Sequence, residues 1–503
     1  MKMKITKPIG TLLLKRLSII ICVLLTLCSC GAAKDSELND DSGRPDVNQT
    51  DSGGGSFEEV SAKYPDKTVL VWAIEGYIKS TRTAAVNEYL DSMGCDYAVC
   101  ILSLDDEDIH ISTSHLQLIK GMISDNRQLD IIYSGGVTVG IDDCTNAYHS
   151  LVKDGILIPL DDYLADTESG KKLYSLMPEK HWDGVKVSGH IYGIDGSIRT
   201  MSYYTGYTVD KAAADEYGFD INVYPCEQLD ILAEIAKEHT VCYNQVFNIP
   251  QCYAPAYAIT DAVYWDNSQN KARCILENEG FLRNLETYYT LRKNGYVTEW
   301  SAGTPFIDFE WNHIGTTSVV YQDRYAHFDS NLYIVPTWSA TGISAKSKYP
   351  DKAFELLALA QTDPVLNNLL VYGVEGEDYN IEDGRADTGG YASPKADTFA
   401  NRLICLPDKG FPANAAEIYR DSLENAELPS CNGFVFHERD IIGVIRKTDG
   451  FFNRQEFGDM LNSDSYESFE ALIQAAKAKL EEYGINEVID EINGQYGEWK
   501  NEK

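Results

Sequence analysis

Aromatic side chains are the residues of this sequence best suited to contact a ligand. The chain has 32 Tyr against only 16 Phe, and tyrosine combines a flat apolar ring with a hydroxyl group that forms hydrogen bonds. The rings are densest in two runs, Met201–Tyr207 (MSYYTGY) and Tyr257–Asn267 (YAITDAVYWDN). A sugar offers C–H faces for stacking and hydroxyls for hydrogen bonds. Aromatic rings beside Asp, Glu and Asn side chains therefore indicate a carbohydrate ligand.

The predicted ligand-binding residues are aromatic rings along the chain and acidic residues near predicted strand ends. They are Trp72, Glu75, Tyr133, Trp182, Asp195, Tyr204, Tyr207, Trp265 and Trp338. Each ring has the alternative of packing in the core, because large aromatic side chains are highly buried on average in globular proteins. The sequence leaves that choice open for every ring.

Motifs for catalysis or metal binding are missing from the sequence. It contains no GxSxG, HExxH or Walker A motif, and the glycines of residues 134–140 lack the Lys–Ser/Thr pair of a phosphate-binding loop. The acidic run Leu104–His110 (LDDEDIH) lacks EF-hand spacing, so it is predicted to be a solvated loop. We therefore predict no catalytic residue, no metal and no cofactor. A glycosidase needs only two facing carboxylates, and 77 acidic residues leave that alternative open.

The N-terminus has the layout of a lipoprotein signal peptide. Five basic residues precede an apolar run, Leu17–Leu27, which is too short to span a bilayer. The run leads into Leu27–Cys30 (LCSC), which resembles a bacterial lipobox. We predict that residues 1–29 are removed and that lipidated Cys30 anchors the protein to the extracellular side of the cell membrane. The alternative is an ordinary secretory signal with an incidental cysteine.

Residues 30–65 are predicted to be a disordered tether. They are rich in Gly, Ser, Asp and Asn, so they cannot bury enough apolar surface to offset the entropy cost of ordering. Without the signal peptide the chain has 38 basic against 77 acidic residues, a formal charge of −39. Such a charge disfavours nucleic acid and anionic lipid surfaces as partners.

Nine cysteines follow residue 30, an odd number with scattered spacing and no CxxC motif. An exported protein normally pairs its cysteines, but this pattern favours unpaired thiols that pack as small apolar residues. A single bridge between Cys242 and Cys252 remains open.

The first folded segment alternates predicted strands and helices. Thr68–Ile74, residues 95–104 and residues 129–136 are predicted strands, and the segments between them are predicted helices. Such alternation predicts a parallel sheet covered by helices. Ligands of parallel sheets bind at the carboxyl ends of the strands. These ends here are the loops that hold Glu75, Gly76, Tyr133, Ser134 and Gly135.

Residues 334–364 are predicted to change from a strand into a helix. Pro350 is suited to the first helical position and Asp351 to the positive end of the helix dipole. Asp363 and Pro364 then cap and begin a second helix, which Gly373 ends.

Three segments resemble extracellular solute-binding proteins of ABC importers, family 1, and within it the lipoprotein branch that handles oligosaccharides. They are His190–Asp220, which ends in Tyr-Gly-Phe-Asp, Pro336–Ile381, and Tyr483–Trp499. The resemblance covers Asp66–Trp499.

The resemblance implies an α/β, two-lobed periplasmic-binding-protein-like (type II) fold with a ligand cleft between the lobes. The first lobe is expected to comprise residues 66–195 and 332–402, and the second lobe residues 196–331 and 403–503. Trp338 and Tyr204 are the favoured ligand contacts, because they lie beside two of the expected crossings between lobes.

The implied function is capture of an oligosaccharide by hinge closure and its delivery to ABC transporter permease subunits. A monomer with no enzymatic activity is expected. The alternatives are a binding protein for peptides or other small polar solutes, a lipid-anchored glycosidase and a static glycan adhesin.

Overall fold

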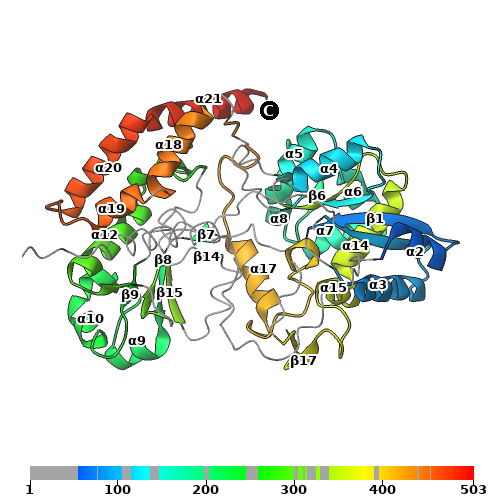
Figure 1. Cartoon of the computed structure of the whole chain (residues 1–503), viewed down its shortest axis with the longest axis horizontal. Coiled ribbons are helices and arrows are strands. Elements are labelled where there is room, and N and C mark those ends of the chain that lie inside the picture. Colours follow the sequence, from blue (N-terminus) through cyan, green and yellow to red (C-terminus); the bar gives the residue numbers. More distant parts are fainter. Residues whose placement is uncertain are drawn as a thin grey trace, which may run out of the picture. The chain divides into compact units, whose positions relative to one another are not determined.

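The computed structural model (Figure 1) describes most of the chain after the predicted tether. The described residues are 55–75, 78–104, 115–135, 147–196, 203–204, 206–244, 259–299, 304–309, 312–313, 324–328, 339–389, 396–434, 436–438, 441–453 and 455–502. Cys30 and residues 31–54 of the predicted tether lie outside them. The end of that prediction at residue 65 was wrong, because Phe57–Lys63 form the helix α2, whose Val60 is buried. Five cysteines of this part are free, in keeping with the predicted unpaired thiols: Cys95, Cys100, Cys226, Cys274 and Cys405. Cys252 lies outside the described residues, so its bridge to Cys242 stays an open prediction.

A five-stranded sheet organises the first group of elements. Its order is β2-β1-β3-β16-β6, and its strands are β1 (Thr68–Ile74), β2 (Tyr97–Ser103), β3 (Ile131–Tyr133), β6 (Gly193–Ile194) and β16 (Thr341–Ile343). β1 pairs in parallel with β2 and β3, which confirms the predicted parallel sheet. β16 runs antiparallel to both β3 and β6, so β6 points the same way as β1, β2 and β3.

Both faces of this sheet are covered, which explains why β1 is apolar along its whole length. Leu70, Trp72 and Ile74 point into one core cluster, while Val69 and Val71 point into another on the opposite face. Successive side chains of a strand alternate between faces, so the run TVLVWAI supplies two cores at once.

Helices far apart in the sequence cover the first of these faces. α3 (Ser80–Ser92), α7 (Glu168–Leu176), α14 (Pro350–Thr362) and α15 (Pro364–Val371) contribute to its core. Figure 1 shows α14 and α15 beside α3 although they lie over 250 residues away in the chain. The other face is covered by α2 (Phe57–Lys63), α4 (His115–Ser124) and α5 (Ala147–Lys153).

The predicted helix pair after β16 is confirmed. Pro350 is the first residue of α14, and the side chain of Asp363 accepts a hydrogen bond of 2.9 Å from Leu366 N at the start of α15. Gly373 follows α15 with a φ of +94°, and a Cβ there would lie 2.2 Å from Asp378 Oδ2. Both its backbone conformation and this close contact require glycine.

A second core surrounds smaller sheets. β13 (Ile307–Asp308), β8 (Gly206–Asp210) and β15 (Arg324–Phe328) form an antiparallel sheet in that order, and β9 (Cys242–Tyr243) pairs in parallel with β12 (Val297–Thr298). The helices around this core are α9 (Lys211–Tyr217), α10 (Leu229–Ile235), α12 (Glu279–Lys293), α18 (Ile442–Asn453), α19 (Glu456–Asn462), α20 (Phe469–Tyr483) and α21 (Ile485–Glu502). The C-terminal helices, red and orange in Figure 1, thus share a core with the green middle of the chain.

The structure also describes further helices and strands, most of them short. They are α6 (Asp161–Asp166), α8 (Glu179–Val185), β4 (Lys186–Val187), β5 (His190–Ile191), β7 (Tyr203–Tyr204), η1 (Pro225–Glu227), β10 (Val263–Asp266), β11 (Lys271–Cys274), η3 (Ile275–Glu277), β14 (Asn312–His313), β17 (Asn380–Glu382), β18 (Arg385–Asp387), α16 (Ala396–Phe399) and α17 (Ala415–Asn425).

The chain passes from the first core to the second core after residue 423, whereas the expected boundary between the lobes was at residue 403. Tyr419 and Leu423 of α17 are buried in the first core, and the second core resumes only at Cys431. Residues 403–423 therefore pack with the first sheet, because the apolar face of α17 is buried there.

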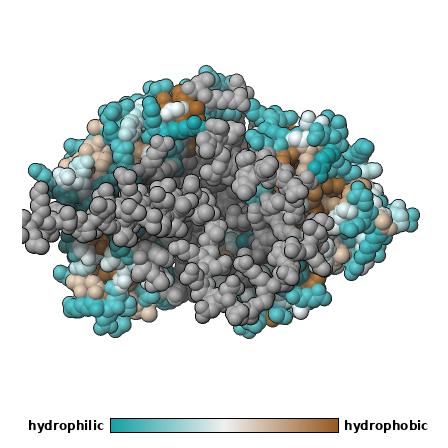
Figure 2. Space-filling view, viewed as in Figure 1, coloured by the Kyte–Doolittle hydropathy of each residue, from teal (hydrophilic) through white to brown (hydrophobic). Residues whose placement is uncertain are grey.

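The surface in Figure 2 is mainly hydrophilic where the described residues are seen, in keeping with the acidic composition. Within this part of the chain, no helix combines the length and the hydropathy needed to cross a bilayer.

Candidate functional site

The candidate site lies at one edge of the first sheet. β1, β3 and β6 point the same way, so the residues that follow them lie along the same carboxyl edge of the sheet: Glu75, Ser134 and Asp195. Ligands of open α/β sheets bind at this edge. The topology therefore places two predicted acids, Glu75 and Asp195, at the edge where a ligand is expected, with Ser134, also expected at a strand end, between them.

Glu75 is paired with a histidine that sequence reasoning did not select. His115 Nδ1 lies 3.8 Å from Glu75 Oε1, and the two side chains are about one fifth exposed. Gly135, with a φ of +79°, packs on both, since a Cβ there would lie 3.6 Å from Glu75 Oε2 and 3.7 Å from His115 Cβ. A partly exposed carboxylate beside an imidazole accepts hydrogen bonds from hydroxyl groups. His115 begins a helix, and only the fold brings it to the end of β1.

Ser134 holds the start of β16 at the same edge. Its backbone N donates to Ala340 O at 3.0 Å, and Ala340 N donates to Ser134 Oγ at 3.0 Å. Tyr133, at the end of β3, is 4% exposed. The segment that enters β16 is thereby fixed beside the end of β3.

The residues that follow β6, Asp195 and Gly196, pack closely against residues 400–402. Asp195 is 3% exposed, and Arg402 N donates to Gly196 O at 2.9 Å. A Cβ at Gly196 would lie 2.2 Å from Gln361 Oε1 and 2.5 Å from Ala400 O. Only glycine permits this approach, so residues 400–402 form part of the wall of the site edge.

A network of three buried amide side chains holds residues 399–403 in place. Gln361 Nε2 and Asn367 Nδ2 both donate to Phe399 O, at 2.9 and 2.8 Å. Asn401 Nδ2 donates to Gln361 O at 2.7 Å, and its Oδ1 accepts from Leu403 N at 3.0 Å. Such buried networks are rigid because breaking one bond leaves a polar group without a partner.

A polar cavity of about 300 Å³ lies at the carboxyl ends of the parallel strands β9 and β12 in the second core. It is lined by Asn244, Arg292, Val297, Thr298, Glu299 and Asn462. Asn244 N donates to Thr298 O at 2.8 Å, and Asn244 Oδ1 accepts from Tyr288 Oη at 3.0 Å. Arg292 is engaged by Asp464 Oδ1 at 3.3 Å. Mixed charges and amides suit a neutral polar ligand.

Sequence reasoning missed this cavity. β9 and β12 each contain only two residues, which is too short for a hydrophobic pattern to show. The available signal was a polar residue directly after each apolar pair, Asn244 and Glu299.

Three of the tryptophans predicted to bind the ligand are buried in the cores, so the structure does not place them on a surface open to a ligand. Trp72 is 0% exposed, with its ring edge-on to Phe399 at 5.2 Å. Trp182 is also 0% exposed, and Trp265 is 2% exposed. The indole N–H of Trp182 donates to Tyr174 O at 3.0 Å. Burial of these large rings is worth more to the cores than a surface position.

The predicted tyrosines differ in outcome. Tyr207 is 1% exposed and stacks on His327 at 5.0 Å, and its hydroxyl donates to Val223 O at 3.2 Å. Tyr204 belongs to β7, where its backbone pairs with Asn312; its side chain is outside the described part, as is all of Trp338. The ligand contacts predicted for these two residues stay predictions.

One carboxyl group near the second core has a strongly altered titration. Burial, and after it the charge of Asp261, raises the pKa of Asp449 on α18 to about 8. Asp449 Oδ1 also accepts a hydrogen bond of 3.1 Å from Ala262 N. The neutral acid is therefore favoured in the folded protein.

Comparisons with known proteins agree with this architecture. No protein-family model matches the sequence. The chain is 23% identical over 378 residues to a carbohydrate ABC transporter substrate-binding protein of Streptococcus pneumoniae, a match that covers 67% of this chain and 75% of the relative.

Solved structures of solute-binding proteins share the fold. The N-glycan transport solute binding protein NgtS of S. pneumoniae matches 87% of this chain and 100% of its own, with a TM-score of 0.64 and 19% identity. An extracellular solute-binding protein of Bifidobacterium longum subsp. infantis matches 86% of this chain and 98% of its own, with a TM-score of 0.53 and 11% identity. The predicted α/β type II fold is confirmed, and so is the resemblance to solute-binding proteins of ABC importers.

Proposed function

We propose that this chain, which has the two-lobed fold of the solute-binding proteins of ABC importers, captures an oligosaccharide and delivers it to permease subunits. The carbohydrate-transport relative and the N-glycan transport protein with the same fold support a sugar as the ligand. The protein works as a binding protein without enzymatic activity, anchored by lipidated Cys30 on the extracellular side of the membrane. The LCSC segment after a short apolar run supports this anchor.

The observation that carries the proposal is the carboxyl edge of the first sheet. Glu75 and His115, each about one fifth exposed, lie close together there beside Gly135, and the buried Asp195 lies on the same edge. Carboxylates accept hydrogen bonds from sugar hydroxyls, and hydrogen bonds to charged groups contribute about 1.5–3 kcal/mol each. Tyr204 and Trp338, the favoured aromatic residues of the sequence, would add stacking surfaces on a sugar.

Ligand capture would proceed by closure of the two lobes on the sugar. A ligand shifts such an equilibrium only by binding the closed state more tightly than the open one. The radius of gyration in solution scattering should therefore fall when the sugar is added to an initially open protein. A saturating sugar that leaves the scattering unchanged would contradict closure.

A thermal-shift screen tests the ligand class. Neutral N-glycan fragments, other oligosaccharides and short peptides are added to the mature protein, and a bound ligand at 100 times its Kd should stabilise the fold by about 2.7 kcal/mol. A shift with peptides but with no sugar would establish the rival ligand class. Shortened glycan products after incubation would indicate a glycosidase.

A matched pair of variants then tests the site. Glu75→Gln should weaken sugar binding about 10-fold or more, because it removes a charged acceptor at the sheet edge. Glu88→Gln is the control, since its side chain is 68% exposed and pairs only with Lys63 among the ion pairs of the described residues. Equal sugar affinity in both variants would show that Glu75 does not contribute to binding and would contradict a ligand site at this edge.

A further inference from the structure

The last connection between the two cores is anchored firmly at its first-core end. α17 ends at Asn425, and its Leu423 is fully buried in the first core. Lys180 Nζ, from α8, donates to Glu424 O at 2.8 Å and to Ala426 O at 2.7 Å. These bonds satisfy carbonyls at the helix end, where a positive charge is favoured. The chain therefore stays with the first core up to residue 426.

Ser430 marks the second-core end of the connection. Its backbone N donates to Asn267 Oδ1 at 2.8 Å, and its hydroxyl accepts from the indole N–H of Trp265 at 2.8 Å. Tyr496 Oη donates to Ser430 O at 3.2 Å. Cys431 is 1% exposed within the second core. The crossing is thus confined to residues 427–429.

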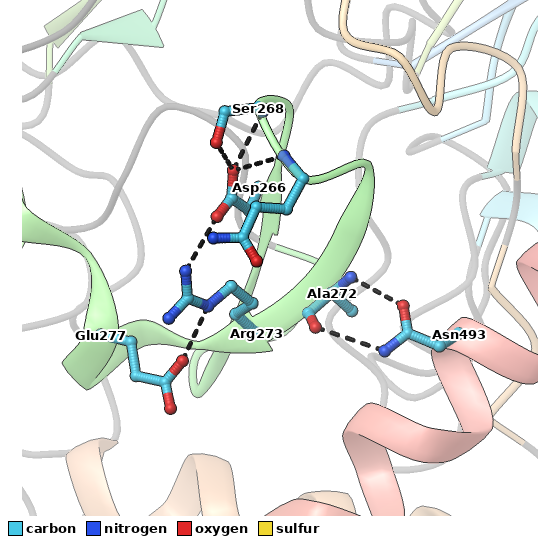
Figure 3. Close-up of polar contacts among 7 residues, drawn as sticks. Asp266, Ser268, Ala272, Arg273, Glu277 and Asn493 are labelled. Carbon is cyan, nitrogen blue, oxygen red and sulfur yellow. Dashed lines mark hydrogen bonds and ion pairs between the residues drawn. The ribbon is translucent and has the colours of Figure 1, made fainter.

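The β10–β11 hairpin that holds Ser430 is itself braced. Figure 3 shows Arg273 between two carboxylates, Asp266 Oδ2 at 3.0 Å and Glu277 Oε2 at 2.8 Å. It also shows Asn493 of α21 pairing with the backbone of Ala272, whose N donates to Asn493 Oδ1 at 2.8 Å. Movement of Ser430 would therefore carry the hairpin and α21 with it.

Just beyond this anchor, one side chain reaches back to the first core. Asn432 Nδ2 donates to Asp183 O at 3.0 Å. Asp183 is in α8, whose Trp182 and Val185 are buried in the first core. An electrostatic effect also acts between the two parts: burial, and after it the charge of His437, lowers the pKa of His149 on α5 to about 4.

We propose that the Asn432–Asp183 bond is a latch that stabilises the described arrangement of the lobes, and that residues 427–429 are the hinge which it locks. The inference rests on the proposed closure of the lobes. It names a contact that affects the equilibrium between the open and closed arrangements in the absence of ligand. Lys180 and Asp183 both belong to α8 of the first core, whereas Asn432 lies beyond the Ser430 anchor, so the latch joins the two bodies across residues 427–429. A neutral hydrogen bond shifts such an equilibrium about 2–12-fold.

The test compares Asn432→Ala and Asn432→Asp with Asn425→Ala in the mature protein without ligand. Asn425 is the control because its Nδ2 donates to Asp421 O at 2.8 Å, a bond within a single helix, α17. The readouts are the radius of gyration from solution scattering and hydrogen exchange of the amides of residues 427–434. Melting temperatures show that all variants are folded.

Both Asn432 variants should change the radius of gyration and speed hydrogen exchange, while Asn425→Ala should match the wild type. Scattering and exchange equal to the wild type in both latch variants would overturn the inference. Because no sugar is added, a failure of oligosaccharide binding would leave this result unaffected, and the two proposals fail separately. Where a sugar binds, a smaller radius must accompany a lower Kd, since both report the same closed fraction.

Discussion

Gly196→Ala is the most direct test of how the site edge is built. A Cβ at this position would lie 2.2 Å from Gln361 Oε1 and 2.5 Å from Ala400 O. Non-bonded carbon and oxygen atoms do not approach so closely, so at least one of these groups must move by more than half an ångström. The oxygen of Ala400 belongs to a backbone carbonyl, so it cannot move aside by a side-chain rotation.

The surrounding hydrogen bonds set the size of the effect. Phe399 O accepts from Gln361 and Asn367, and Asn401 N donates to Asn367 Oδ1 at 3.2 Å. Overpacking of this kind costs about 1–3 kcal/mol, and a buried bond broken by the shift costs about 1–3 kcal/mol more. We expect Gly196→Ala to lower the free energy of unfolding by about 3 kcal/mol.

Urea denaturation followed by circular dichroism measures this free energy. Gly121→Ala is the matched control, because Gly121 lies in α4, is exposed, and has no heavy atom within 4 Å of an added Cβ. Alanine there should stabilise the helix by about 0.5–1 kcal/mol. A Gly196→Ala protein as stable as the wild type would refute the close packing of residues 196 and 400. Sugar binding should also weaken in this variant, because Asp195 would shift with its neighbour.

Three further predictions follow from other parts of the chain. Cys30→Ser should release the protein from membranes, as measured by cell fractionation, and a mutant that stays bound and normally matured would contradict the lipobox assignment. Tyr204→Ala and Trp338→Ala should each weaken sugar binding by about 1–3 kcal/mol if their rings stack on the ligand; unchanged affinity in both, with the fold intact, would place the cleft elsewhere. The pKa of Asp449 is raised to about 8, so the fold favours the neutral acid and loses stability as the pH rises from about 4 to about 8. Asp449→Asn should therefore melt higher than the wild type near pH 8 and at a similar temperature near pH 4, and a constant difference across that range would exclude this titration.

Much of the first lobe could be predicted from the sequence by local patterns. The apolar run Thr68–Ile74 is a strand buried on both faces, and the Pro350 and Asp363–Pro364 signals mark where α14 and α15 begin. Such signals are local because they depend on backbone geometry within a few residues. The alternation of strands and helices then restricts the sheet to a parallel order. These facts predict a parallel sheet with covering helices and place Glu75 at the end of a strand, whereas the two-lobed fold was implied by the resemblance to solute-binding proteins.

Other features were decided only by tertiary packing. Tryptophan rings are suited to stack on a sugar, but in this structure three of them are buried in the cores: Trp72, Trp182 and Trp265. The sequence could not show this, because burial depends on neighbours that are distant in the chain. His115 reaches Glu75, and residues 400–402 reach Gly196, only after the sheet has formed.

The last crossing between the lobes was likewise beyond local reasoning. α17 packs with the first core rather than the second, because its buried face fits the helices there and Lys180 holds its end. Periodicity in the sequence shows that a helix has an apolar face, but it does not show which core that face enters. Local geometry is encoded residue by residue, whereas the partner of each apolar face is selected by packing over the whole chain.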